Sequence, residues 1–309
     1  MMKRVYGGIE AGGTKFSCIV ASDPDHILAE NRFPTTSPDE TLGRAIAFFQ
    51  PFASRSELSG IGIGSFGPVD LHKNSPSYGS IITTPKPGWG RVEILGRIRS
   101  ALQVPVFFDT DVNAAAFGEH YWTASNRNCD PLVYMTVGTG IGIGVIANGH
   151  LVHGLVHPEA GHMAIPHNRQ LDPFDGICPF HGDCLEGLAS GPSMARRWGE
   201  PAEKLPYDHP AWKIEVEYLG LAIANIVYAY SPQRIILGGG VSQHAGLHDL
   251  VCQKVRSLIN GYIQSPAILD DMDNYIIPPT LGTSSGVLGA IAMAITGMDP
   301  SWNKAPAKV

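Results

Sequence analysis

The sequence has little charge, no basic run and no long apolar stretch. Lys, Arg, Asp and Glu make up 16% of its 309 residues, and the formal net charge is -6. This balance argues against a surface that binds nucleic acid, which needs an excess of positive charge. No segment approaches the roughly 18 apolar residues of a membrane span, and the first residues contain no signal-peptide core. We therefore expect a cytoplasmic protein that binds neither nucleic acid nor membrane.

Cysteine is also scarce, and its five occurrences are an odd number. Three cysteines stand alone in apolar or surface-like stretches and are interpreted as inert thiols: Cys18, Cys129 and Cys252. Cys178 and Cys184 instead enclose His181 within seven residues. A redox pair typically has the C-x-x-C spacing, and a Cys/His cluster in a reducing compartment is more often a metal site than a disulfide.

What the sequence does have is hydrophobic content, 44%, and a length beyond that of most single cores. Two domains are the natural expectation. A strand, a glycine-rich turn and a second strand are predicted twice, over 5–21 and 132–147. A short buried strand that ends in a glycine loop is also predicted twice, over 60–69 and 234–241. Two halves of similar design follow from these pairs.

Helical patterns lie between the predicted strands, over 41–52, 112–122 and 212–230. Asp39 or Ser37 is placed to cap the first of them. Strands that alternate with helices predict an α/β protein whose sheets are covered on their faces. The polar segment 166–179 is predicted to be a loop that leads to the Cys/His cluster.

Glycine loops that follow strands are candidate phosphate sites, because backbone N–H groups can converge on an anion where no Cβ intrudes. Neither the first nor the second loop matches the P-loop or the dinucleotide fingerprint. Each glycine loop, taken alone, could also be a tight hairpin that binds no ligand. Four such loops in matching halves favour a bound nucleotide: 12–15, 138–142, 238–240 and 282–286.

Six motifs occur in order along the chain: E10-A-G-G-T-K15, T110-D-V-N-A-A-A116, T136-V-G-T-G-I-G142, H157-P-E-A-G-H162, C178-P-F-H-G-D-C184-L-E186 and L237-G-G-G-V241. Together they resemble the ROK family of sugar kinases, within the actin-like ATPase superfamily, from residue 8 to about residue 290. The first motif, the segment G64-S-F-G-P68 and the Cys/His motif resemble bacterial fructokinases most.

The resemblance implies two actin-like, ribonuclease H-like α/β domains with a nucleotide and sugar cleft between them. We expect an N-terminal domain over 1–116, completed by a C-terminal helix at about 288–309. The second domain is expected over 117–287 and would carry the metal-bound loop. The family often dimerises, so a homodimer is a further expectation.

Asp111 is the residue expected to act as the catalytic base. It stands where the apolar strand 104–108 gives way to a helix, which places a carboxylate at the carboxyl edge of a sheet. Capping of that helix is the alternative that position alone leaves open. The resemblance implies that Asp111 takes the proton from the sugar hydroxyl as it attacks the γ-phosphate of ATP. Thr110 stands where many relatives have a sugar-contacting Asn.

The resemblance also implies the nucleotide and magnesium sites. Glu10 would face Mg²⁺ through water, with a solvated strand-end carboxylate as the alternative. The residues that would hold ATP come from three loops: Gly12, Gly13, Thr14, Lys15, Thr136, Gly138, Thr139, Gly140, Gly239 and Gly240. The sugar contacts implied, besides Thr110 and Asp111, come from three segments: Gly67, Glu159, His162 and Glu186. Most other histidines are interpreted as ordinary surface or core residues, while His157 adjoins the sugar segment and stays open.

Four thiol and imidazole ligands would close a tetrahedral structural zinc site: His162, Cys178, His181 and Cys184. In most relatives the clustered ligands are three cysteines, and His181 replaces the middle one here. A closed set of four leaves no position for a reactive water, so a structural role is expected.

The sequence is thus expected to encode an ATP-dependent hexose kinase that forms fructose 6-phosphate. Glucokinase, mannokinase and N-acylmannosamine kinase stay open, because few polar contacts discriminate between hexoses. A ROK repressor would carry a helix-turn-helix ahead of the first glycine loop, where this sequence has about seven residues. An actin- or chaperone-like ATPase would not need Glu159, His162 and Glu186.

Overall fold

The computed structural model describes residues 4–298. Residue contacts divide the chain into two compact units. Unit 1 contains Met1–Asn128, Gly144–Pro158 and Thr280–Val309, and unit 2 contains Cys129–Ile143 and Glu159–Pro279. The expected domain boundaries after residues 116 and 287 fall inside helices of the structure, and the domain division stays a prediction. Residues 299–309 of the expected C-terminal helix lie outside the described residues.

The first sheet has five strands in the order β3-β2-β1-β4-β5. β1 pairs with β2 antiparallel and with β4 parallel, and β4 pairs with β5 parallel. The predicted strand, glycine turn and strand at the start of the chain are therefore confirmed. The strands are β1 (Val5–Ala11), β2 (Lys15–Asp23), β3 (His26–Pro34), β4 (Leu58–Ser65) and β5 (Val106–Thr110).

The second sheet has the order β10-β9-β6-β7-β8. Here β6 pairs parallel with β9, and β9 pairs parallel with β10. Read from β8, this sheet repeats the order of the first one, strand for strand, which confirms two halves of similar design. Its strands are β6 (Leu132–Val137), β7 (Ile141–Ala147), β8 (His150–Leu151), β9 (Arg234–Gly238) and β10 (Ile276–Ile277).

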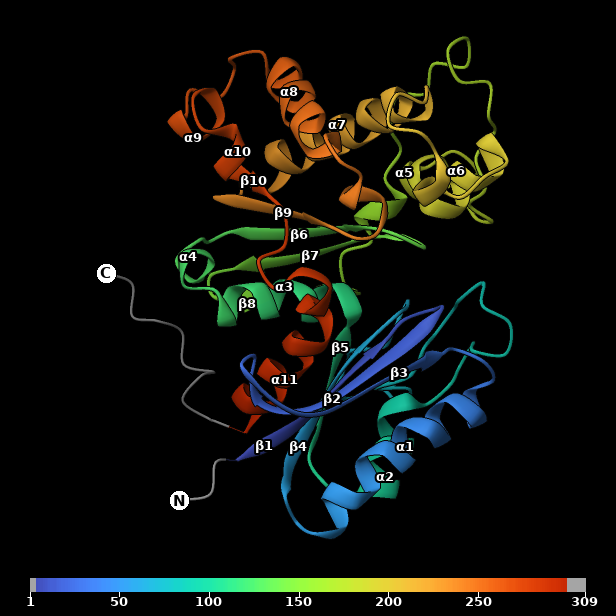
Figure 1. The fold of residues 1–309 in the computed structure, drawn as a ribbon, viewed down its shortest axis with the longest axis vertical. Helices are drawn as coiled ribbons and strands as arrows, with labels where there is room; N and C mark the ends of the chain where they lie inside the picture. The colour runs from blue at the N-terminus through green and yellow to red at the C-terminus, as the bar shows by residue number, and fades with distance from the viewer. Residues whose placement is uncertain (1–3, 299–309) are drawn as a thin grey trace. The chain divides into compact units, whose positions relative to one another are not determined.

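In unit 1, helices cover both faces of the first sheet (Figure 1). α1 and α2 bury Phe49, Ile94 and Ile98 in one core cluster with β1 and β4, while α11 packs on β1, β4 and α3. Ser37 caps α1 by accepting a hydrogen bond from the Glu40 N–H. The helices are α1 (Pro38–Ser54), α2 (Ile94–Leu102), α3 (Asp111–Trp122), α4 (Ala124–Arg127) and α11 (Ser285–Gly297), preceded by the short turn η4 (Gly282–Ser284).

Glycines let α11 approach its neighbours closely. A Cβ on Gly62 of β4 would lie 1.8 Å from the Ala290 carbonyl oxygen, and one on Gly289 would lie 1.7 Å from that of Ala114. A residue larger than glycine at either position would force the two facing backbone segments apart. These contacts hold α11 close to β4 and to α3, the helix that begins with the expected catalytic aspartate.

In unit 2, the long apolar helix predicted over 212–230 is α7 (Ala211–Tyr230), which packs against α8 (Leu247–Ile259). The shorter helices are α5 (Leu185–Ala189), α6 (Gly191–Trp198), α9 (Pro266–Leu269) and α10 (Met272–Tyr275), with 3-10 turns η1 (Ala160–His162), η2 (Ala202–Lys204) and η3 (Val241–Gln243). Segment 166–179 contains no helix, as predicted. Among the helices of residues 4–298, none combines the length and apolar character that crossing a membrane requires.

Unit 2 also contains a group of buried polar and charged side chains, two of which, Glu215 and Tyr218, belong to α7. Arg197 pairs with Asp172 at 3.0 Å, and the Tyr218 hydroxyl donates to Asp172 at 2.5 Å. Glu215 lies in the same helix, fully buried, and within the described residues neither of its carboxylate oxygens has a hydrogen-bond partner. Burial raises the pKa of Glu215 to about 8, against the opposing charge of Arg197.

Glu215→Gln is therefore expected to remove a pH dependence of stability. The folded protein binds the Glu215 proton more tightly than the unfolded chain does. The stability that this proton adds to the folded protein is fully present below the pKa of Glu215 in the unfolded chain. It is lost as pH rises toward the pKa of the folded protein, by about 1.4 kcal/mol of unfolding free energy per pH unit between about pH 5 and 8. Urea unfolding at pH 6 and pH 8 measures it: the wild type should weaken more than the variant. An equal change in both proteins would contradict a protonated Glu215.

Candidate active site

The residues expected from the sequence fall into two groups, one in each unit. Unit 1 contains Glu10, Gly12, Gly13, Thr14, Lys15, Gly67, Thr110 and Asp111. Unit 2 contains Thr136, Gly138, Thr139, Gly140, Glu159, His162, Cys178, His181, Cys184, Glu186, Gly239 and Gly240. Most of them lie at strand ends or in the turns that follow strands, where an α/β sheet presents groups to a ligand.

Asp111 is the first residue of α3 and directly follows β5. Its carboxylate accepts a hydrogen bond from the Val112 N–H at 2.8 Å. Burial raises the pKa of Asp111 to about 6, and the Val112 N–H opposes this rise. A half-buried carboxylate that is still ionised at neutral pH suits proton abstraction from an alcohol.

The N-cap of α3 is supplied by Thr110, the neighbour of Asp111. The Thr110 hydroxyl oxygen accepts a hydrogen bond from the Asn113 N–H at 3.0 Å, and Thr110 is the N-cap of α3. Thr110 is buried and its hydroxyl oxygen is engaged in this cap, which leaves the hydroxyl hydrogen as a donor for a ligand. Asp111 is thereby left with a carboxylate that the helix does not require for capping.

Glu10 lies near the end of β1 and close to Asp111. Its pKa is raised to about 7, mainly by burial and next by the negative charge of Asp111, while Lys15 and Arg32 oppose the rise. Two neighbouring carboxylates with oxygen donors only are the kind of group that suits Mg²⁺. The donors present therefore fit a magnesium ion held near Glu10.

The first glycine loop is a tight turn between β1 and β2. The Gly12 N–H donates to the Lys15 carbonyl at 3.0 Å, and a Cβ on Gly12 would lie 2.8 Å from that oxygen. A Cβ on Gly13 would meet no atom within 4 Å. Gly13 thus leaves open space at the tip of the loop, where a phosphate can approach the backbone.

Gly286 of α11 leaves room for the Glu10 carboxyl group. A Cβ at residue 286 would lie 2.7 Å from Glu10 Cδ and 3.0 Å from its Oε1, so Gly286→Ala must displace this side chain. We expect the Mg²⁺ concentration for half-maximal activity to rise by roughly 10-fold, as when a group that orients a metal ligand is lost. Magnesium titration of activity measures it.

Gly43→Ala is the matched control, since a Cβ on Gly43 of α1 would meet no atom within 4 Å. Both substitutions replace a helical glycine, which favours the helix by up to about 1 kcal/mol. An unchanged Mg²⁺ dependence in Gly286→Ala, in which the added Cβ displaces the Glu10 carboxyl group, would show that Glu10 does not act near the ion.

The structure adds two residues that the sequence analysis did not select. The Asp109 carboxylate, buried beside Thr110, contacts His153 Nε2 at 2.8 Å and also accepts from the Asn113 side chain at 2.7 Å. Asp109 raises the pKa of His153 through this hydrogen bond. The one sequence signal for Asp109 is that it lies two residues before Asp111, and no motif contains His153.

In unit 2, the second glycine loop follows β6. The Gly138 N–H donates to the Gly140 carbonyl at 2.9 Å, and the Ile141 N–H donates to Glu186 Oε2 at 2.9 Å. A Cβ on Gly140 would lie 2.7 Å from the same oxygen. Glu186 is therefore tied to the loop expected to hold phosphate, and its other carboxylate oxygen remains for a further contact.

Gly239 and Gly240 follow β9 and differ in their surroundings. Gly239 has φ +95°, and a Cβ there would lie 2.3 Å from the Val137 carbonyl oxygen. Only glycine fits this position. A Cβ on Gly240 would meet no atom within 4 Å, so the backbone there is open to a close approach by a ligand.

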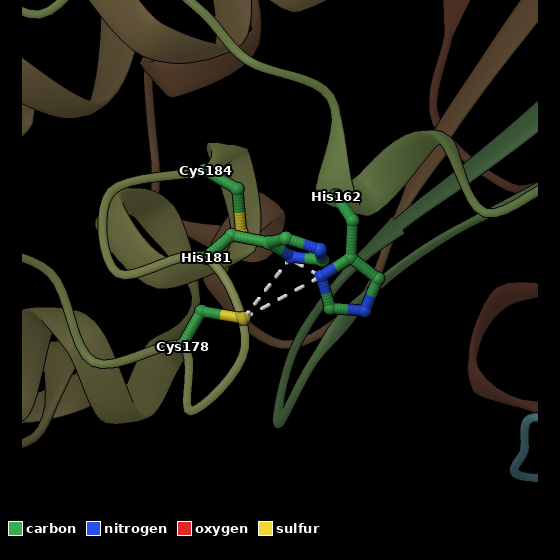
Figure 2. Close-up of side chains that lie close together, drawn as sticks. All are labelled: His162, Cys178, His181 and Cys184. Carbon is green, nitrogen blue, oxygen red and sulfur yellow. Dashed lines mark hydrogen bonds between the residues drawn. The ribbon is translucent and has the colours of Figure 1, made fainter. Parts of the chain in front are cut away.

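The predicted Cys/His cluster is assembled in unit 2. Its four ligand atoms lie within 4.8 Å of one another, and the cysteines are free thiols. Cys178 Sγ lies 3.7 Å from His162 Nδ1 and 3.6 Å from His181 Nδ1, and Cys184 Sγ lies 3.5 Å from His162 Nδ1. Figure 2 shows the four side chains converging, His162 from η1 and the others from one loop. The four residues of the cluster are His162, Cys178, His181 and Cys184.

These distances fit a tetrahedral zinc site. With Zn–S of about 2.3 Å and Zn–N of about 2.0 Å, the ligand atoms of a tetrahedron lie roughly 3.3–3.8 Å apart. Cys178 and Gly182 exchange two backbone hydrogen bonds, at 3.1 and 2.9 Å, which close the loop around the cluster. The donor set and these three sulfur–nitrogen distances therefore suit a zinc ion.

His162 joins the cluster to Glu186. Its Nδ1 faces both sulfur atoms, while its Nε2 lies 4.0 Å from Glu186 Oε1. A carboxylate that accepted a hydrogen bond from this second nitrogen would orient the ring of a metal-bound histidine. Cys184 precedes α5, which carries Glu186, and Glu159 precedes η1, which carries His162. The cluster therefore ties together two segments that carry expected sugar contacts.

Comparison with known proteins extends these observations to the whole chain. The ROK family model matches residues 6–296. A fructokinase of Lactococcus lactis subsp. cremoris is 42% identical over 95% of this chain and 98% of its own length, and one of Streptococcus mutans is 42% identical over the same shares. The crystal structure of a ROK hexokinase from Thermus thermophilus superposes with a TM-score of 0.73 at 27% identity, over 95% and 99% of the two chains. The fold is the expected mixed α/β, actin-like ATPase fold, and the chain belongs to the ROK family.

Proposed function

We propose that this chain is an ATP-dependent fructokinase that transfers the γ-phosphoryl group of ATP to D-fructose, forming ADP and D-fructose 6-phosphate. The observation that carries the activity is the 42% identity to fructokinases over nearly the full length of both chains. The ROK hexokinase neighbour supports the same class of reaction at the level of fold and family.

Asp111 is the general base of this reaction. The attacking hydroxyl must lose its proton as the bond from its oxygen to the γ-phosphorus forms and the bond to the ADP oxygen breaks. A pKa of about 6 keeps Asp111 ionised at neutral pH, and the Val112 N–H holds one carboxylate oxygen in place. The other oxygen is left to accept the proton.

The remaining residues bind and orient the substrates. Glu10 would hold Mg²⁺, which when bound neutralises charge on the phosphates. The sugar contacts are proposed for Gly67, Thr110, Glu159, His162 and Glu186, and the phosphate contacts for the loops at 12–15, 136–140 and 239–240. The zinc ligands would be His162, Cys178, His181 and Cys184, with a structural role.

A coupled ADP-release assay tests the proposed function. Fructose should support the highest kcat/KM, with glucose, mannose and N-acetylmannosamine as the competing sugars. If glucose or N-acetylmannosamine were preferred, the chain would be a different ROK hexose kinase. If no sugar raised ADP release, the kinase assignment would fail, and a sugar-binding regulator would take its place.

A further inference from the structure

Two segments of unit 1 that are far apart in the sequence are joined by histidines. The Val69 N–H donates to His157 Nε2 at 3.1 Å, and His72 Nε2 donates to the Leu155 carbonyl at 2.7 Å. The first bond spans 88 residues and the second spans 83. The segment 153–157 therefore holds the loop that begins at Gly67 from one side.

The first of these bonds requires a neutral imidazole. His157 Nε2 receives a hydrogen atom from the Val69 N–H, so this nitrogen must carry a lone pair and the ring proton must sit on Nδ1. His157 is 5% exposed, and burial lowers its pKa. The neutral form, with its acceptor at Nε2, is therefore the one that prevails at neutral pH.

Gly67 lies next to this hydrogen bond. A Cβ on Gly67 would lie 2.9 Å from the Val69 nitrogen and 3.6 Å from His157 Nε2. The Gly67 backbone is therefore a neighbour of both partners of the hydrogen bond. If the Val69 N–H lost its acceptor, it would be a buried and unsatisfied donor, and the loop would rearrange to find another.

We propose that His157 is a positioning residue for the sugar: its Nε2 holds the Val69 N–H and so fixes the backbone at Gly67. The inference rests on the proposed function, in which Gly67 contacts the sugar. His157 acts through Val69 and Gly67, so its loss should weaken sugar binding before it affects the chemistry at Asp111.

Two variants of His157 distinguish the loss of the hydrogen-bond acceptor at Nε2 from the loss of the imidazole ring. The amide oxygen of glutamine can reach the position of Nε2, whereas that of asparagine reaches only as far as Nδ1. His157→Asn is expected to raise the KM for fructose by roughly 10-fold and to change the KM for ATP by less than about 2-fold, in line with the loss of an orienting contact. His157→Gln should restore the KM for fructose to within about 3-fold of wild type.

Steady-state kinetics of the full-length chain with fructose and with ATP measure both effects, and thermal melting checks the fold. An unchanged KM for fructose in His157→Asn would overturn the inference. So would equal losses in both variants, or a failure of both to fold, because either would assign His157 a general packing role. A wild-type enzyme that phosphorylates another hexose would instead refute the fructokinase proposal, and the same comparison would be made with the accepted sugar. If no hexose were phosphorylated, calorimetric fructose binding to the three proteins would give the same comparison.

Discussion

Asp111→Asn is expected to lower kcat by roughly 10²–10⁴-fold, with little change in the KM for either substrate. Asparagine keeps the shape of the side chain and can still accept the hydrogen bond from the Val112 N–H, but it cannot take a proton. The loss should therefore appear in the chemical step. Coupled ADP release with saturating fructose and ATP measures it.

Asp39→Asn is a matched control, because Asp39 is an exposed carboxylate in the first turn of α1, as Asp111 lies in the first turn of α3. It should leave kcat within about 2-fold of wild type. The wild-type kcat should also fall as pH drops through about 6, since Asp111 must be ionised to act as a base. Full activity in Asp111→Asn would leave the reaction without its base and would refute the mechanism.

Cys184→Ala is expected to abolish zinc binding at the proposed site and to raise the KM for fructose by roughly 10–100-fold. Cys184 directly precedes the helix that carries Glu186, and its sulfur lies 3.5 Å from His162 Nδ1. Without this ligand, the segments with Glu186 and Glu159 are no longer tied together. The KM for ATP should change less, because four of the expected phosphate-loop residues lie in unit 1: Gly12, Gly13, Thr14 and Lys15.

Metal analysis by atomic emission and kinetics with both substrates test this expectation. The wild type should contain about one equivalent of zinc, which a strong chelator removes with the same rise in the KM for fructose. Cys252→Ala is the control, because Cys252 is a buried thiol of α8 in the same unit, outside the cluster. Equal losses of fructose and ATP binding in Cys184→Ala would point to general unfolding instead.

Local patterns explain why much of the fold was predictable. Alternation of short apolar strands with glycine turns anticipated β1, β2, β6 and β7, and helical periodicity anticipated α7 to within one residue. The change from strand to helix at Asp111 was also readable, because β5 and α3 are contiguous. Each of these signals depends on residues a few positions apart, which is the range that propensity and periodicity cover.

The helix packing in unit 1 was not predictable in this way. The approach of α11 to β4 and α3 depends on Gly62 and Gly289, which oppose backbone atoms of segments more than 170 residues away. In the sequence these glycines are indistinguishable from those of turns. Their role emerges only when the opposing carbonyl oxygens are in place.

The sequence by itself indicated part of the fold, the grouping of the Cys/His side chains and the carboxylate at the start of α3. The elements it indicated are β1, β2, β4, β5, β6, β7, β9, α1, α3 and α7. The tertiary structure alone decided which side chains support them. Asp109 meets His153 across 44 residues, and Val69 meets His157 across 88. A local pattern carries no record of such pairs, since a single sequence shows which residues can form a hydrogen bond and only the folded chain brings donor and acceptor within about 3 Å.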